Sequence, residues 1–188
     1  MIIGLLGLAG SGKDTCADFL VEQHNYVRYA FGDKVKEVAR IMFDFDDDQL
    51  YGNLKNEKDI RWNITPRECF QIIGTDFGQF YLHEKLPNLN ISNRELWSKH
   101  FEIWYKKELE KNKDIKVVVS DVRFKHEINS IKKLGGKIIN IVRPSINTSK
   151  EVYNHLSEQE QQDIEISDSI IYNHSTKYQL YFDLMKNI

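Results

Sequence analysis

The stretch Gly7-Leu8-Ala9-Gly10-Ser11-Gly12-Lys13-Asp14-Thr15 decides how the rest of this chain is expected to fold. It follows an apolar run at residues 2–6 and leads into a helix-like segment at 13–24. A loop that wraps a polyphosphate points several backbone N–H groups inward, and glycine tolerates the backbone conformations that this requires. Lys13 adds a positive charge, and the N-terminus of the helix adds its dipole. The pattern therefore predicts a phosphate-binding loop; a glycine-rich turn that binds nothing is the alternative.

The residue after Lys13 departs from the usual pattern, which has a magnesium-binding serine or threonine at this place. Asp14 stands there instead, and Thr15 follows one place later. A carboxylate beside phosphates repels them unless a metal intervenes, so Asp14 is a candidate for a water-mediated Mg²⁺ contact. Alternatively, Asp14 complements the helix dipole from the first turn. Both interpretations stay open.

The composition predicts one domain with a proper core, because 41% of the 188 residues are hydrophobic. The formal net charge of −2 argues against binding to a nucleic acid polymer and suits free nucleotides better. Cys16 and Cys69 lack metal-ligand spacing, which fits small buried side chains in a reducing cytoplasm. The apolar start has no basic leader and no stretch has membrane length, so no membrane association is expected.

Apolar runs and helical periodicity alternate along the chain, which predicts a parallel sheet with helices on both faces. The expected strands are residues 1–6, 25–30, 115–120, 137–142 and 169–172. The expected helices are 13–24, 33–43, 125–134 and a last one from Ser175. Two capping boxes, Thr65-Pro66-Arg67-Glu68 and Ser92-Asn93-Arg94-Glu95, predict a helix from Pro66 to Gly74 or beyond and another to about Lys111. Residues 83–91 are interpreted as a polar connection. The aspartates at 44, 46, 47 and 48 are interpreted as part of a solvated loop.

Polar residues that follow the strands are expected to meet at one edge of this sheet, because ligands bind at the carboxyl ends of parallel strands. These residues are the loop at 7–15, Asp33, Asp121 with Arg123, Arg143 and Asn173. Arg67 and Gln71 lie one turn apart on one face of a predicted helix.

With these residues in hand, the chain resembles the phage-type deoxynucleoside monophosphate kinases, a branch of the P-loop nucleoside monophosphate kinases. The matching residues are Gly-x-x-Gly-Ser-Gly-Lys-Asp-Thr at 7–15, Tyr29-Ala30-Phe31-Gly32-Asp33 with Lys36-Glu37, Thr65-Pro66-Arg67-Glu68 with Gln71 and Gly74-Thr75-Asp76, Trp97, Asp121-Val122-Arg123-Phe124, His155-x-Ser157-Glu158 and Asn173. The resemblance implies a single three-layer α/β domain over 1–188 with five parallel strands in the order 2-3-1-4-5. It also implies a helical acceptor-binding region at about 33–112 and a short lid at about 145–162.

The activity implied by the resemblance is transfer of the γ-phosphoryl group of ATP, with Mg²⁺, to a deoxynucleoside monophosphate. Such catalysis consists mainly of alignment and charge neutralisation. The ATP-binding residues it implies are Gly7, Gly10, Ser11, Gly12, Lys13, Asp14, Thr15 and Asn173, which begins the loop that borders adenine. The catalytic residues are Lys13, Asp121 as a water-mediated magnesium ligand, Arg123 on the transferring group and Arg143 beside the lid. The acceptor-binding residues are Asp33, Lys34, Arg67 for the phosphate, Gln71 for the base and Trp97, which would stack on the base.

Each of these roles has a plainer alternative. The arginines at strand ends are also suited to surface ion pairs, Trp97 to core packing, and residues 173–176 to an ordinary helix cap. The sequence leaves open which bases are accepted, whether the sugar must be deoxyribose and whether the chain forms a homodimer.

Three other functions use the same phosphate loop. A GTPase switch needs Asn-Lys-x-Asp after a strand, whereas Asn112-Lys113-Asp114 has the wrong spacing and precedes one. A kinase of another small acceptor, such as dephospho-coenzyme A or a phosphorylated metabolite, is the main alternative, because a phosphate loop does not identify the acceptor. A non-catalytic nucleotide-binding module would leave Asp121 and Arg123 without a role.

Overall fold

The computed structural model describes residues 1–144 and 167–188. The chain divides into two compact units, which are the sheet unit (Met1–Ala30 with Glu102–Ile188) and the helical unit (Phe31–Phe101). The expected lid at about 145–162, with His155 and Glu158, lies outside the described residues. The single-domain expectation and the acceptor-binding role of residues 33–112 stay predictions.

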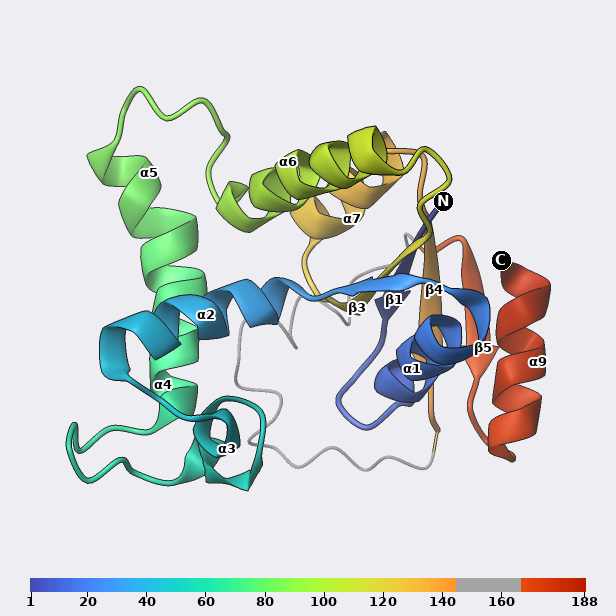
Figure 1. Cartoon of the computed structure of the whole chain (residues 1–188), viewed down its shortest axis with the longest axis horizontal. Coiled ribbons are helices and arrows are strands. Elements are labelled where there is room, and N and C mark those ends of the chain that lie inside the picture. The colour runs from blue at the N-terminus through green and yellow to red at the C-terminus, as the bar shows by residue number, and fades with distance from the viewer. Residues whose placement is uncertain (145–166) are drawn as a thin grey trace. The chain divides into compact units, whose positions relative to one another are not determined.

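The sheet unit contains five parallel strands, and their order is β2-β3-β1-β4-β5 (Figure 1). The strands are β1 (Ile2–Leu6), β2 (Val27–Tyr29), β3 (Val117–Val122), β4 (Lys137–Val142) and β5 (Ser169–Tyr172). All residues of β1 are buried, as expected for a central strand covered on both faces. The predicted α/β class and the strand order 2-3-1-4-5 are confirmed.

Two strands differ from their predicted limits. β2 is shorter than 25–30, because Asn25 ends the preceding helix with a left-handed φ of 58° and the next helix begins at Phe31. β3 begins and ends two residues later than predicted, since Ile115 and Lys116 are still outside the ladder. Asp121 is therefore the penultimate residue of β3 and does not follow the strand.

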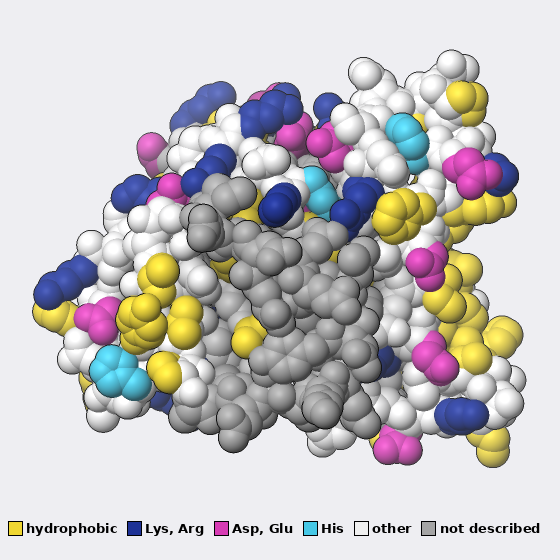
Figure 2. Space-filling model, turned by 180° about the vertical axis from the view of Figure 1, so that it is seen from behind, with side chains coloured by type: hydrophobic (Ala, Val, Ile, Leu, Met, Phe, Trp, Pro, Cys, Tyr) yellow, Lys and Arg dark blue, Asp and Glu magenta, His cyan; other side chains and the backbone are white. Residues whose placement is uncertain are grey.

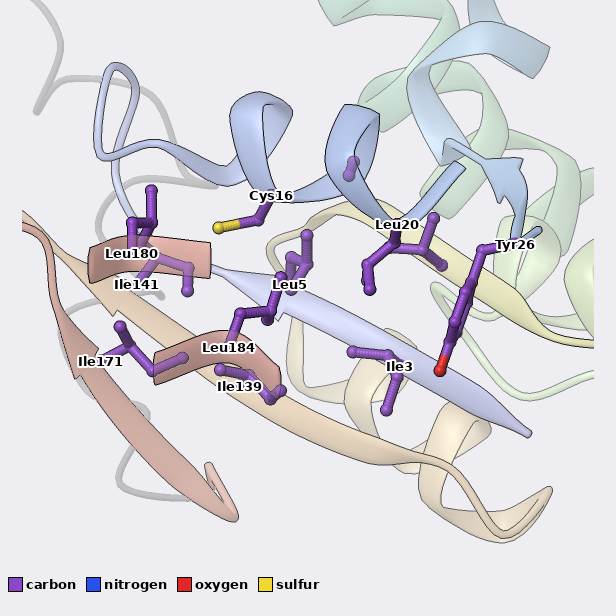
Figure 3. Close-up of a cluster of buried hydrophobic side chains, with 12 residues drawn as sticks. Ile3, Leu5, Cys16, Leu20, Tyr26, Ile139, Ile141, Ile171, Leu180 and Leu184 are labelled. Carbon is purple, nitrogen blue, oxygen red and sulfur yellow. The ribbon is translucent and has the colours of Figure 1, made fainter. Parts of the chain in front are cut away.

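One face of the sheet is covered by α1 (Lys13–His24) and α9 (Lys177–Asn187). Figure 3 shows Cys16 and Leu20 of α1 and Leu184 of α9 packed over Leu5 and neighbouring strand residues. On the other face, α7 (Lys125–Lys133) places Ile131 against Gly4, where an added Cβ would lie 3.0 Å from the Ile131 Cδ1 atom. The sheet thus lies between two helical layers, as predicted.

The helical unit is built around a separate core of buried side chains. Its elements are α2 (Phe31–Phe43), α3 (Asp47–Leu50), the 3₁₀ helix η1 (Asn53–Asn56), α4 (Pro66–Gln71), the π-helix η2 (Ile72–Tyr81), α5 (Leu82–Lys85) and the first residues of α6 (Leu96–Lys111). The core residues are Val35, Ala39, Phe45, Leu50, Cys69 and Ile73.

On the face of the molecule shown in Figure 2, charged side chains of both signs are mixed with hydrophobic ones. No helix within the described ranges is long and apolar enough to cross a membrane.

The first capping box is confirmed, whereas the second is only half formed, with the Ser92 N–H donating to the Glu95 carboxylate at 3.3 Å. The Thr65 hydroxyl accepts from the Glu68 backbone N–H at 3.2 Å, and the Glu68 carboxylate accepts from the Thr65 N–H at 2.7 Å. The helix that starts there continues without a break to Lys85, so residues 83–85 are not part of a polar connection.

At the second box the helix starts later, at Leu96, because Arg94 has a left-handed φ of 72° and its N–H bonds the Gln79 carbonyl. The last helix likewise begins after its expected start. Its N-cap is Thr176 and not Ser175.

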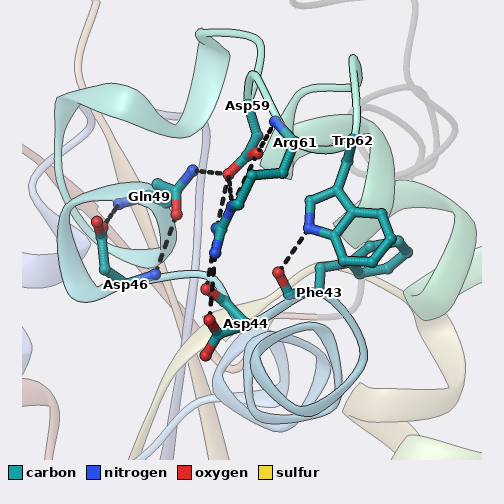
Figure 4. Close-up of polar contacts among 7 residues, drawn as sticks. All are labelled: Phe43, Asp44, Asp46, Gln49, Asp59, Arg61 and Trp62. Atoms are coloured by element: carbon teal, nitrogen blue, oxygen red, sulfur yellow. Dashed lines mark hydrogen bonds and ion pairs between the residues drawn. The ribbon is translucent and has the colours of Figure 1, made fainter.

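The acidic cluster is more ordered than the solvated loop that its sequence predicted. Asp46 caps α3, and Gln49 of α3 donates to the Asp59 carboxylate at 2.7 Å (Figure 4). Arg61 also bonds Asp59, and it reaches Asp44 at 3.2 Å. The Arg61 and Gln49 hydrogen bonds hold the pKa of the buried Asp59 carboxyl well below its usual range. Asp44 and Asp47 remain exposed to solvent.

Candidate functional site

The phosphate loop adopts a backbone that only glycine tolerates easily. Gly7, Gly10 and Gly12 have φ values of 140°, 77° and 111°. Side chains with a Cβ atom rarely adopt this region, so the three glycines of the sequence pattern are a conformational requirement.

Donor groups at the end of this loop are suited to an anion. Helix α1 begins directly after Gly12, which provides no side-chain cap for the first turn. The Ser11 side chain is 2% exposed, and its hydroxyl has no hydrogen-bond partner among the described residues. An uncapped helix start beside an orphaned buried hydroxyl fits a phosphate group, whose oxygens accept from both.

Lys13 lies over the loop. Its ammonium group donates to the Gly7 carbonyl and, at 2.8 Å, to the Leu8 carbonyl. The positive charge of Lys13 is therefore held beside the first two residues of the phosphate loop.

A cavity of about 300 Å³ opens beside the loop. Its lining comes from three segments that are far apart in the sequence, namely the phosphate loop, the end of β4 and the segment after β5. The lining residues are Gly10, Gly12, Lys13, Asp14, Thr15, Arg143, Asn173, Ser175, Lys177 and Leu180. The structure thus brings Arg143 and Asn173 to the loop, as the strand order requires. Lys177, the first residue of α9, was missed by sequence reasoning. Its signal was a cation in the first turn of the helix that follows a strand.

Asn173 braces the phosphate loop. Its side-chain N–H donates to the Ser11 carbonyl at 2.8 Å. A Cβ atom on Gly12 would lie 2.6 Å from the Asn173 Nδ2 atom, so the glycine allows this close approach. Asn173 therefore contacts the loop itself, and its expected place beside adenine stays a prediction.

The turn after Asp121 is fixed by Glu127, which sequence reasoning also missed. The Glu127 carboxylate is 3% exposed and accepts from the N–H groups of Arg123 at 2.7 Å and Phe124 at 3.0 Å. Burial, together with the neighbouring Asp121 charge, raises the pKa of Glu127 to about 8. A glutamate three residues into a helix is typical of such a reciprocal cap.

Arg28 is a third residue that sequence reasoning missed, and its sequence context gave no signal. Its guanidinium donates to the Asp14 carboxylate, to Asp18 at 2.8 Å and to the Ser120 hydroxyl at 3.0 Å. The candidate magnesium ligand Asp14 is thus engaged by a cation. Within residues 1–144 and 167–188, no three His, Cys, Asp or Glu side chains cluster as a metal site.

The expected acceptor residues all lie in the helical unit. Lys34 pairs with Glu37 at 2.7 Å, and Asp33 accepts from Lys36 at 3.4 Å. The exposed Arg67 donates to the Asn56 side chain at 2.6 Å. Gln71 is the last residue of α4 and is half-buried.

Trp97 is used for packing within the helical unit. Its indole N–H donates to the Gly74 carbonyl at 2.8 Å. The ring lies so close to Gly78 that an added Cβ there would be 2.7 Å from the Trp97 Nε1 atom. These contacts favour the packing alternative, while stacking on a base stays a prediction.

Two sequence comparisons find similarity to deoxynucleotide monophosphate kinases. A family model described as deoxynucleotide monophosphate kinase matches residues 44–184, which leaves the phosphate loop outside the match. A protein of Acanthamoeba polyphaga mimivirus named "Putative deoxynucleotide monophosphate kinase" is 35% identical over 188 residues, covering 98% of this chain and 94% of that protein.

Two solved structures share the fold at low sequence identity. TT1252 from Thermus thermophilus has a TM-score of 0.53 and 17% identity, with 99% of this chain and 95% of that chain covered. A sugar kinase from Janibacter sp. HTCC2649 has a TM-score of 0.50 and 9% identity, with 98% and 92% covered. At these identities the likeness concerns the fold alone.

Proposed function

Because this chain belongs to the deoxynucleotide monophosphate kinase family, we propose that it transfers the γ-phosphoryl group of ATP to a deoxynucleoside monophosphate. The products are the deoxynucleoside diphosphate and ADP. The observation that carries this proposal is the glycine-rich loop with an uncapped helix start, opening on a cavity lined by Lys13, Arg143 and Lys177. Three cations beside backbone N–H groups suit the polyphosphate of a nucleoside triphosphate.

On the donor side, the loop N–H groups and Lys13 bind the β- and γ-phosphates, and Thr15 meets the α-phosphate. Arg143 reaches the donor phosphates from the end of β4. Asn173 keeps the loop in its binding conformation through the Ser11 carbonyl. Lys13, Thr15, Arg143 and Asn173 all line the cavity, so one bound ATP would contact them together.

In the transfer step, a phosphate oxygen of the acceptor attacks the γ-phosphorus as the bond to the β–γ bridging oxygen breaks. Arg123 stabilises the charge on the transferring phosphoryl group. Glu127 fixes the backbone of Arg123 by accepting from the Arg123 and Phe124 N–H groups. The protein contributes alignment and charge and makes no covalent bond with the substrates.

Mg²⁺ accompanies ATP in this proposal, and it neutralises phosphate charge when bound. Proteins often hold Mg²⁺ through one or two carboxylates while phosphates and waters complete its shell, so a three-residue cluster is not required. Asp121 is the carboxylate we assign to this contact through water, and Asp14 is the second candidate.

The acceptor is assigned to the helical unit. Arg67 is our choice for its phosphate, because the guanidinium is exposed on the first turn of α4. Gln71 follows one turn later for the base, with Asp33 and Lys34 at the start of α2. Trp97, which packs against Gly74 and Gly78, is assigned to stack on the base.

We place the reaction in a reducing cytoplasm, that of the host cell if the chain is viral. Cys16 and Cys69 are both free and buried, which suits such a compartment.

A coupled assay of ADP release tests the proposal, with ATP, Mg²⁺ and a panel of dGMP, dTMP, dCMP, dAMP and their ribose counterparts. We expect turnover with one or more deoxynucleotides and much less with ribonucleotides. Silence across the panel in a preparation that binds ATP would instead favour a kinase of another small acceptor.

A further inference from the structure

We infer that Arg28 is a positioning residue of the donor site, because its guanidinium neutralises Asp14 and so keeps that carboxylate from repelling the phosphates of ATP. This inference rests on the proposed function. It also accounts for an aspartate at the place where phosphate loops usually carry a neutral hydroxyl.

Arg28 is held in place from two sides. It projects from β2, and its Nε atom donates to the Ser120 hydroxyl on the neighbouring strand β3 at 3.0 Å. Its two terminal nitrogens bond different carboxylates, Asp14 and Asp18. These aspartates lie four residues apart, on one face of α1. The planar fork of arginine suits three separate partners in a way that a lysine ammonium does not.

Asp14 lies where an uncompensated negative charge would matter. Of the described residues that line the cavity, it is the one acidic side chain, beside Lys13, Arg143 and Lys177. Arg28 is not itself among the lining residues, so its charge acts there through Asp14. An unpaired carboxylate at this position would oppose the polyphosphate that the three cations attract.

Two alternative roles of the Arg28–Asp14 pair predict different effects of mutation. If Asp14 instead holds Mg²⁺ through water, its removal adds to any loss caused by changing Arg28. If the contact is an ordinary surface ion pair, changing Arg28 has little effect on ATP, because exposed pairs contribute little. A double-mutant cycle separates these two roles from neutralisation of Asp14 by Arg28.

The experiment compares wild type, Arg28→Met, Asp14→Asn and the double variant, with KM for ATP and kcat measured at saturating acceptor. Methionine keeps the length of the arginine stem and removes its charge. We expect Arg28→Met to raise KM for ATP by about tenfold, with a smaller effect on kcat, since like-charge repulsion weakens binding. Adding Asp14→Asn should recover most of that loss, and added salt should reduce it.

Arg40→Met is the matched control. Arg40 and Asp47 form a similar pair in the helical unit, with exposures of 44% and 82% against 36% and 79% for Arg28 and Asp14. Neither residue lines the cavity. We expect KM for ATP to stay at the wild-type value in this control.

Thermal unfolding of each variant separates folding from function. If Arg28→Met fails to fold, Arg28→Lys takes its place in the cycle, and we expect a smaller rise in KM that Asp14→Asn again reverses. An unchanged KM in the Arg28 variant, or a double variant worse than Arg28→Met, overturns the inference. If the wild type itself transfers no phosphoryl group, the proposed function fails instead, and the Kd of ATP in the same cycle still tests the pair.

Discussion

The sheet unit and the helical unit use their charged side chains differently. In the sheet unit, Lys13, Arg143 and Lys177 line one cavity beside the phosphate loop. In the helical unit, Arg40 and Arg61 bond aspartates of the same unit. Cations that line a cavity can contact an anionic ligand directly, whereas the charge of cations paired with neighbouring carboxylates is compensated within the protein. Charge alone therefore does not identify a site, and its partners must be known.

The largest expected effect is that of replacing Lys13. If this effect were absent, the proposed difference between the charged residues of the two units would not hold. Lys13→Ala should lower kcat by at least roughly 10³-fold, because the variant loses the charge nearest the transferring phosphate. The measurement is steady-state turnover, with circular dichroism to verify folding. Lys186→Ala, on the outer side of α9 near the Phe182 ring, is the control. Normal turnover of Lys13→Ala would remove the phosphate-loop assignment.

Cooperative unfolding of the two units can be tested with one core substitution in each. Leu20 is fully buried in the sheet unit, and Ile73 is buried in the core of the helical unit. Replacing either with alanine should cost about 3 kcal/mol, because each change leaves a cavity. If the chain is one cooperative domain, both variants lower the midpoint of the same calorimetric transition. Two transitions, each moved by only one variant, would show that the units unfold separately.

Arg67 tests whether the helical unit binds the acceptor. Arg67→Ala should raise KM for the deoxynucleotide by about 30-fold and leave KM for ATP nearly unchanged, because a charged hydrogen bond to the acceptor phosphate is lost. Asn56→Ala, which removes only the neighbour of Arg67, is the comparison variant. An effect confined to ATP would move Arg67 to the donor side.

The smallest effect concerns acid stability of the network around Asp59. Its lowered pKa stabilises the folded state above the unfolded pKa of about 4, and this contribution is lost as the pH falls further. Arg61→Met removes the principal cause of the lowered pKa, so the melting temperature should decrease at pH 7 and depend less on pH between 4 and 2. A melting curve series over pH checks this. An unchanged acid slope would mean that Arg61 does not control Asp59.

Structural features that depend on only a few consecutive residues were predictable. The positive φ values of Gly7, Gly10 and Gly12 follow from one local pattern, and the Thr65 cap from four consecutive residues. The strand order was implied by the family resemblance, and the uninterrupted apolar runs indicated which strands are buried.

Features that depend on tertiary partners were missed, even where a local signal existed. Arg28, Glu127 and Lys177 are ordinary charged residues until the fold brings Asp14, the Arg123 N–H group or the cavity beside them. The incomplete capping box at Ser92 has the same origin, because the Gln79 carbonyl accepts from the Arg94 N–H and holds Arg94 out of the helix.

The most direct test of the central claim follows the phosphoryl group itself. The protein is incubated with ATP labelled in its γ-phosphate, Mg²⁺ and the deoxynucleotide that the panel selects, and the products are separated by chromatography. We predict that the label appears in the deoxynucleoside diphosphate in proportion to the ADP formed, and that Lys13→Ala abolishes this transfer. Label released only as inorganic phosphate would show an ATPase and contradict the account.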